Sequence, residues 1–294
     1  MRLILALLVV FLSGCGNTPK QDDYVKYVNK LNLKEISRTG VKFRFNSTNV
    51  ELRGKHSNDS LIDASPILYQ GGAGLAGLAL QIGAHSSIVS SQRQEKLKQV
   101  QDQANEAVQP FIDVSNSLQM DDLLGEYAGQ VTTEVDYAAN TFDVNAIFFS
   151  SQDMTTLSLK TIVWQKQKTS KKKKSKKTKF SYNNLVQVFS TKLTDDEKNK
   201  IVAGDKALLV NKMSSLLQRA MTIANNDLLG KYSLSKNPAE TFFINDNNKK
   251  KVLRGKVVEE FCNYKVIQNL HYWFIAFPTE PQAAEPNVIQ QCSS

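Results

Sequence analysis

The chain has 294 residues, enough for one large domain or two small ones. Hydrophobic residues make up 41% and charged residues 22%, a balance that excludes a wholly disordered chain, a collagen-like chain and a polytopic membrane protein. Three cysteines in a chain of this length exclude a small scaffold held together by disulfides.

The first fifteen residues have the pattern of an export signal. A short basic start, Met1–Arg2, precedes the uncharged apolar stretch Leu3–Leu12, which is as long as a signal-peptide core and too short to cross a bilayer as a helix. The stretch ends in Leu12-Ser13-Gly14-Cys15, a branched residue, two small residues and a cysteine. These four residues resemble the lipobox of bacterial lipoproteins. An ordinary secretory signal peptide followed by a chance cysteine is the alternative.

The resemblance implies a lipid-anchored protein of a bacterial cell envelope. Cleavage would remove residues 1–14, and Cys15 would carry a diacylglycerol on its sulfur and an acyl chain such as palmitate on its amino group. Residues 15–23 would form a polar tether. In such lipoproteins an aspartate after the cysteine retains the protein at the inner membrane. Because Gly16 and Asn17 follow here, the outer membrane is favoured in a cell with two membranes.

The positive charge of the chain is concentrated in one segment. The formal net charge is +9, of which Arg2 contributes one and the eight lysines of Lys168–Lys179 contribute the rest. The remainder of the mature chain therefore has no net charge, and a basic domain surface of the kind that binds nucleic acid is not indicated.

Residues 157–164 and 180–189 flank this lysine segment and contain alternating apolar side chains, which predicts a β-hairpin with the lysines at its tip. Like charges repel one another and stay solvated. We expect the lysines to contact phosphates of anionic lipid or lipopolysaccharide; a solvated loop without such a role is the alternative. The candidate residues are Lys171, Lys172, Lys173, Lys174, Lys176 and Lys177.

A glycine-rich segment, Ile67–Ala84, has five glycines in eighteen residues and no charged side chain. Small residues recur four positions apart, which in a helix makes a flat face for close packing. The candidate packing residues are Gly72, Ala76, Gly77 and Gly83. The alternatives are a buried soluble helix, a segment inserted in or lying on the membrane, and a dinucleotide site matched by Gly72–Gly77. The third lacks the flanking strands that such a site requires.

Further helices and strands follow in the N-terminal half. Residues 41–45 and 50–52 alternate on either side of a turn and predict a β-hairpin. Residues 92–109 predict a polar helix that Pro110 ends or kinks, and residues 113–124 predict a second helix with Leu118 and Leu123 facing inward.

The second half predicts a sheet covered by a long helix. Residues 131–137 and 142–149 read as strands which, with the hairpin around the lysines, suggest an antiparallel meander. Thr194 and Glu197 form a capping box sequence, and Asp205–Leu229 has a wide apolar face that ends before Gly230. Residues 252–258, 264–267 and 271–277 read as closing strands, the last of them central in the sheet.

The remaining cysteines, Cys262 and Cys292, form an even pair in an exported chain and are candidates for a disulfide that pins the tail to the sheet. The three histidines lack a second ligand at metal-binding spacing, so no metal is predicted. No cofactor is predicted, and no motif for a nucleophilic, metal-assisted or phosphate-binding site occurs.

These patterns predict an α+β protein with an antiparallel sheet, a long packed helix and an N-terminal glycine-rich helical block. The expected divisions are a signal peptide (1–14), a tether (15–23), a hairpin and helical block (24–130), a main sheet domain (131–277) and a proline-containing tail (278–294). The predicted function is a non-enzymatic envelope lipoprotein that acts by binding or assembly, with an envelope protein or anionic lipid as partner. The alternatives are a component of a secretion or pore-forming complex with residues 67–84 in the bilayer, and an envelope hydrolase.

Overall fold

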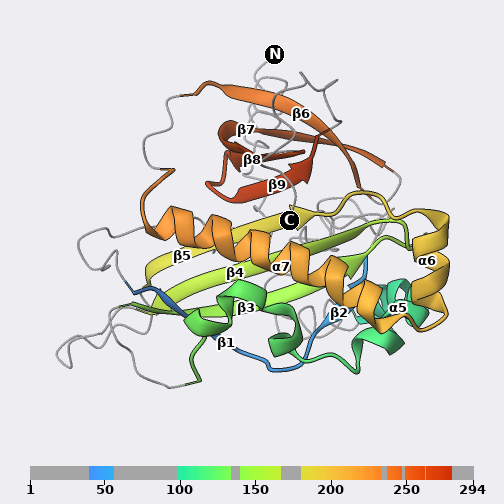
Figure 1. The fold of residues 1–294 in the computed structure, drawn as a ribbon. Coiled ribbons are helices and arrows are strands. Elements are labelled where there is room, and N and C mark those ends of the chain that lie inside the picture. Colours follow the sequence, from blue (N-terminus) through green and yellow to red (C-terminus); the bar gives the residue numbers. More distant parts are fainter. Residues whose placement is uncertain are drawn as a thin grey trace, which may run out of the picture. The chain divides into compact units, whose positions relative to one another are not determined.

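A computed structural model describes residues 40–55, 98–133, 140–166, 180–232, 237–246, 249–261 and 263–279 (Figure 1). All of them belong to one compact unit of the chain. Several predicted features lie outside the described residues: Cys15, the glycine-rich packing residues, the lysine segment, and both Cys262 and Cys292.

Nine strands form one mixed sheet in the described part of the chain. The order is β1-β3-β4-β5-β9-β8-β7-β6, and β2 pairs with β3 as well. The strands are β1 (Lys42–Phe45), β2 (Leu52–Gly54), β3 (Thr141–Ser150), β4 (Leu157–Lys166), β5 (Phe180–Phe189), β6 (Ala239–Asp246), β7 (Lys249–Phe261), β8 (Tyr264–Asn269) and β9 (Phe274–Pro278).

The predicted α+β class is correct, but the sheet is not purely antiparallel. The β3–β4–β5 meander and the β9–β8–β7–β6 run are antiparallel. Strand β9, however, joins β5 in parallel, with Val186 opposite Phe274. The reason is the long connection between β5 and β9, whose helices and strands return the chain to the sheet in the same direction.

The predicted hairpin between residues 41–45 and 50–52 is wrong. Both runs form strands, but β1 and β2 each pair in parallel with β3, at Thr141–Val144 and at Phe148–Ser150. They are two pieces of one interrupted edge strand. The intervening residues leave the sheet, and the amide of Val50 donates a hydrogen bond of 3.4 Å to the Leu118 carbonyl. Strands β1 and β2, which come before residue 131, therefore belong to the same sheet as the strands that follow it.

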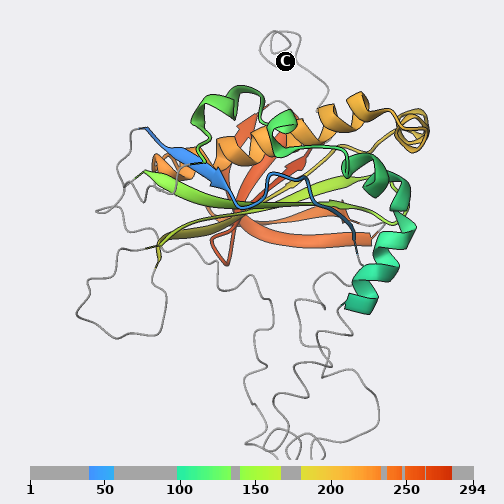
Figure 2. The same cartoon turned by 90° about the horizontal axis from the view of Figure 1, so that it is seen from below.

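One face of the sheet is covered by helix α7 (Lys206–Leu228), which lies across β3–β5 in both views (Figures 1 and 2). The predicted inward face is confirmed, since seven of its residues are buried: Leu209, Met213, Leu216, Leu217, Ala220, Ile223 and Ala224. Asp205 accepts the Leu208 amide as N-cap at 2.9 Å. Gly230 follows the helix with φ +76°, which confirms the predicted stop.

Shorter helices border this core. Residues 98–107 are helical, and α5 (Gln109–Ser115) follows with Pro110 in its first turn, so the predicted break at this proline is confirmed. The predicted helix 113–124 is wrong, because the chain leaves α5 after Ser115 and forms the 3₁₀ helices η3 (Met120–Leu123) and η4 (Gly125–Gln130). Leu118 and Leu123 are nevertheless buried as expected.

A smaller second core lies on the opposite face of β5–β9. Its buried members are Phe189, Ile244, Leu253, Ile267, Ile275 and Phe277. Strand β6, which contributes to this core, was missed by the sequence analysis. The predicted strand 131–137 is not seen in its described part, where Val131 makes only an isolated bridge to Phe43. The strand predicted over residues 271–277 begins only at Phe274, and its predicted central position is confirmed by the two neighbours of β9, β5 and β8.

Candidate functional site

The β4–β5 hairpin that carries the lysine segment is confirmed by its register. Lys166 pairs with Phe180 at the end next to the connection between the strands, and Ser158 pairs with Phe189 at the open end. A shift in register at Gln165 and Lys166 marks the last described pairs before the lysines. Residues 167–179 connect these two strands along the chain, and the candidate lysines themselves lie outside the described residues.

A second basic surface lies on the β6–β7 hairpin, and the sequence analysis did not find it. We use the term basic face for the outward side chains of this hairpin, on the side away from the second core. Its members are Phe243, Lys250, Val252, Arg254 and Lys256, which are all exposed. The alternation of strand side chains places them together, because Ile244 and Leu253 point into the second core.

The centre of the basic face is apolar. Phe243 and Val252 are directly paired across the two strands and are 58% and 60% exposed. The ammonium of Lys250 lies 4.2 Å from the centroid of the Phe243 ring. Two exposed apolar side chains thus adjoin each other on this face, with cations beside them.

The charge on this face has a single sign. Among the described residues, none of Lys250, Arg254 and Lys256 forms an ion pair, and the side chains between them, Thr241 and Asn245, are uncharged. The acids of β6 point to the other side of the hairpin. Three cations and two apolar residues thus share one surface.

One of those acids, Asp246, takes part in a buried ion pair. The Asp246 carboxylate contacts the ammonium of Lys55, and both side chains are almost fully buried. Lys251 reaches the same carboxylate at 3.4 Å, and the Lys55 ammonium lies 4.8 Å from the Phe189 ring. This pair connects the end of β2 to the end of β6, which are at opposite ends of the strand order.

A buried cluster of tyrosines and carboxylates lies at the end of α7. The Tyr182 hydroxyl donates a 2.7 Å hydrogen bond to the Asp227 carboxylate, and the Asn184 amide donates one of 3.1 Å to the same oxygen. Burial raises the pKa of Asp227 from 3.8 to about 6, against the lowering effect of these two hydrogen bonds. Burial also raises the pKa of Tyr182 well above its usual value.

A second pair of the same kind adjoins the first. The Tyr232 hydroxyl donates a short hydrogen bond to the Glu259 carboxylate, and the Asn226 amide donates one of 3.2 Å to the Tyr232 oxygen. Burial and the Glu259 carboxylate raise the pKa of Tyr232. Because Tyr182 is fully buried and Asp227 is 5% exposed, a dissolved substrate does not reach this cluster in the described conformation. Its geometry joins α7 to β5 and β7.

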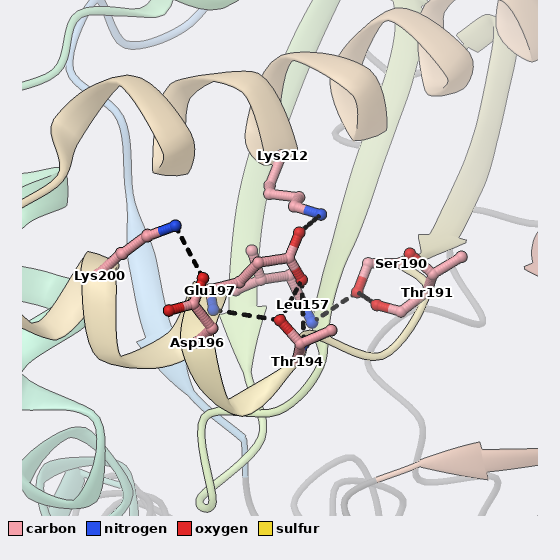
Figure 3. A network of polar contacts seen from close by, with 8 residues as sticks. All are labelled: Leu157, Ser190, Thr191, Thr194, Asp196, Glu197, Lys200 and Lys212. Atoms are coloured by element: carbon pink, nitrogen blue, oxygen red, sulfur yellow. Dashed lines mark hydrogen bonds and ion pairs between the residues drawn. The ribbon is translucent and has the colours of Figure 1, made fainter.

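The start of α6 (Asp195–Val202) holds a further polar network, drawn in Figure 3. The Thr194 hydroxyl accepts the Glu197 amide at 3.2 Å, and the Glu197 carboxylate accepts the Thr194 amide at 2.9 Å, which confirms the predicted capping box. Lys212 of α7 donates a 2.6 Å hydrogen bond to Glu197 (Figure 3). The hydrogen bond from Lys212 lowers the pKa of Glu197. The network fixes α6 against α7.

The carboxylates and histidines show no assembled site within the described residues. Glu259 and Glu260 point to opposite sides of β7, as predicted, since Glu259 bonds to Tyr232 and Glu260 pairs with Lys265 at 3.0 Å. His271 stacks on Trp273 with ring centroids 4.8 Å apart. Within the same residues, no three His, Cys, Asp or Glu side chains lie close enough to share a metal ion.

No family model, curated protein or solved structure matches this chain. In the described part of the chain, no helix combines the length and the apolar character needed to cross a bilayer.

One sequence signal for the basic face was available. The positions of Lys250, Arg254 and Lys256 differ by even numbers, and such residues lie on the same side of a strand. Lys249 and Lys251 lie between and beside these cations and make the run look uniformly basic, and the partner strand β6 has no strong alternating pattern of its own.

Proposed function

We propose that this protein is a lipid-anchored component of a bacterial cell envelope that acts by binding or assembly at a membrane surface. The observation that carries the proposal is Leu12-Ser13-Gly14-Cys15 directly after an uncharged apolar stretch. The mature chain then begins at Cys15, whose sulfur and amino group carry the acyl chains. Gly16 and Asn17 favour the outer membrane.

The energy of such an anchor is large. Each buried methylene contributes about 0.8 kcal/mol, and two or more acyl chains hold a protein on a bilayer far longer than one. Binding by the folded domain then takes place at a surface to which the chain is already confined, so weak contacts are sufficient. The lysine segment and the basic face are two surfaces suited to contacts of this kind.

Acylation of Cys15 is tested by metabolic labelling with a palmitate analogue, followed by mass spectrometry of the mature N-terminus. We expect label on the wild-type protein and none on a Cys15→Ser variant. Cys292→Ser removes a different thiol and is the matched control, which must keep the label. An intact Met1, or an unmodified Cys15 on a secreted protein, would contradict the proposal.

A second candidate function is a secretion or pore-forming component in which residues 67–84 enter the bilayer. The observation that favours it is the absence of charged side chains from Ala64 to Gln92 apart from His85. Alkaline carbonate extraction of a Cys15→Ser variant separates the two functions. Retention in the membrane pellet supports insertion, and release supports anchoring by lipid alone.

A further inference from the structure

We propose that the basic face of the β6–β7 hairpin binds the anionic headgroups of a lipid bilayer. This inference names the partner of the surface-binding role and so rests on the proposed function. The basic face differs from the lysine segment at the β4–β5 tip in carrying exposed apolar side chains as well as charge. It is formed entirely by described residues of two paired strands.

The cations of the basic face complement the negative charge of lipid phosphates. Lys250, Arg254 and Lys256 project from one side of β7, and among the described residues of the hairpin no acidic side chain shares that side. A row of cations without internal partners attracts a surface of negative phosphates and repels a cationic one. Arg254 offers planar donors that match a phosphate, and the two lysines act as point charges.

The apolar centre of the basic face suits the boundary between headgroups and acyl chains. Phe243 and Val252 lie side by side, with cations beside them on the same face. At a membrane surface, aromatic and aliphatic side chains enter the boundary between headgroups and acyl chains while lysine and arginine stay at the phosphates. The Lys250 ammonium lies 4.2 Å from the centroid of the Phe243 ring, so a cation and an apolar ring are in direct contact on this face.

The β6–β7 hairpin lies at the edge of the sheet, and the described part of the chain begins near the proposed anchor in the sequence. Among the described residues, β6 is the last strand of the sheet and no further strand pairs with its outer edge. Gly40, the first described residue, is 25 residues after Cys15, which corresponds to a reach of at most about 85 Å. An anchored chain of this length allows the hairpin to contact the bilayer. An acidic protein partner would explain the cations, but the tether to lipid and the paired apolar residues favour the bilayer.

The experiment measures sedimentation of the mature chain with Cys15→Ser, so that no acyl chain is attached. Because the lysine segment would bind anionic lipid by itself, six of its lysines are changed to glutamine in the background protein: Lys171, Lys172, Lys173, Lys174, Lys176 and Lys177. The vesicles contain phosphatidylcholine alone or with about 30 mol% phosphatidylglycerol, which gives a moderately anionic surface.

We expect the background protein to bind the anionic vesicles and not the neutral ones. Changing Lys250, Arg254 and Lys256 to glutamine should weaken binding by about fivefold per cation, or roughly hundredfold in all. The matched control changes three exposed cations elsewhere, Lys42, Lys192 and Lys231, and lowers the net charge equally. It should weaken binding by less than about fivefold, because its charges are dispersed.

A second measurement reports on the apolar centre. Phe243→Trp places a fluorophore on the basic face, and lipids brominated near the headgroup quench a tryptophan that enters the membrane boundary. Val202→Trp is the control, since Val202 is 43% exposed on the acidic helix α6. We expect quenching that is specific to Phe243→Trp and a blue shift of its emission, both measured relative to the parent protein.

Equal loss of binding in the two triple variants would overturn the proposal and assign the effect to net charge. Failure of the background protein to bind anionic vesicles, or equal quenching of both tryptophans, would overturn it as well. Because every variant lacks the acyl chains, these outcomes are independent of whether Cys15 is acylated. Circular dichroism of each variant verifies that the fold is retained.

Discussion

Tyr182 on β5 donates a hydrogen bond of 2.7 Å to Asp227 in the last turn of α7. The two residues are 45 positions apart and both are buried. The bond attaches the far end of the long helix to a central strand. It also places a carboxyl group where its charge is poorly solvated, and this makes the stability of the fold depend on pH.

The change Asp227→Asn should remove part of that dependence. Burial raises the pKa of Asp227 from 3.8 to about 6, so between these values the folded chain binds more protons than the unfolded chain. The free energy of unfolding contributed by this group is therefore present below pH 4 and is lost as the pH rises through about 6. We expect the fall between pH 4 and pH 7 to be about 2 kcal/mol smaller in the variant.

Urea unfolding at both pH values measures this difference. Asp121→Asn removes an exposed carboxylate and is the control, which should leave the fall unchanged. An equal fall in the wild type and in Asp227→Asn would show that Asp227 titrates alike in the folded and unfolded chains.

The change Gly54→Ala should destabilise the fold at the contact between β2 and the helix over residues 98–107. A Cβ atom on Gly54 would lie 1.9 Å from the Ala104 carbonyl oxygen, which is backbone and has little freedom to move. We expect a loss of about 3 kcal/mol in the free energy of unfolding. Gly129→Ala is the control, because its Cβ meets nothing within 4 Å, and it should change stability by less than about 0.5 kcal/mol.

The change Thr194→Ala should weaken the start of α6. It removes the hydroxyl that accepts the Glu197 amide and leaves that amide without its cap. We expect a loss of about 1 kcal/mol and faster hydrogen exchange in the first turn of the helix. Thr191→Ala is the control, because the neighbouring network uses only its carbonyl (Figure 3). Equal exchange in the two variants would mean that the cap does not stabilise α6.

The change Lys55→Met should leave the Asp246 carboxylate buried with Lys251 as its nearest cation at 3.4 Å. Loss of one member of a buried ion pair costs about 3 kcal/mol, whereas replacing both members by apolar residues is often neutral. We therefore expect Lys55→Met with Asp246→Leu to recover to within about 1 kcal/mol of the wild type. A double variant as unstable as the single one would mean that Lys55 stabilises the fold by packing on Phe189.

Elements with a strong local pattern were predicted well. The capping box at Thr194, the apolar face of α7 and the stop at Gly230 depend on neighbouring residues and were identified from the chain alone. The β4–β5 hairpin was identified for the same reason. The helix predicted over residues 113–124 was wrong, although Leu118 and Leu123 are buried as that helix would have required. Their backbone follows a turn and a 3₁₀ helix, which bury the same side chains.

The basic face and the Tyr182–Asp227 cluster were not predicted, because each joins residues from separate strands or from a strand and a helix. The charge of Lys250, Arg254 and Lys256 was visible in the sequence, but its place beside Phe243 required the pairing of β6 with β7. The unusual pKa of Asp227 required the burial that β5 and α7 produce together.

The order of residues along the chain was sufficient for the location of the net charge and for the ends of α6 and α7, because each depends on side chains a few positions apart. The tertiary structure alone shows that β1 and β2 pair in parallel with β3, and that β9 pairs in parallel with β5. Each of these pairings joins segments that are far apart in the sequence. Backbone hydrogen bonds are satisfied equally by several partners, and only the shared burial of side chains on both sides of the sheet selects among them.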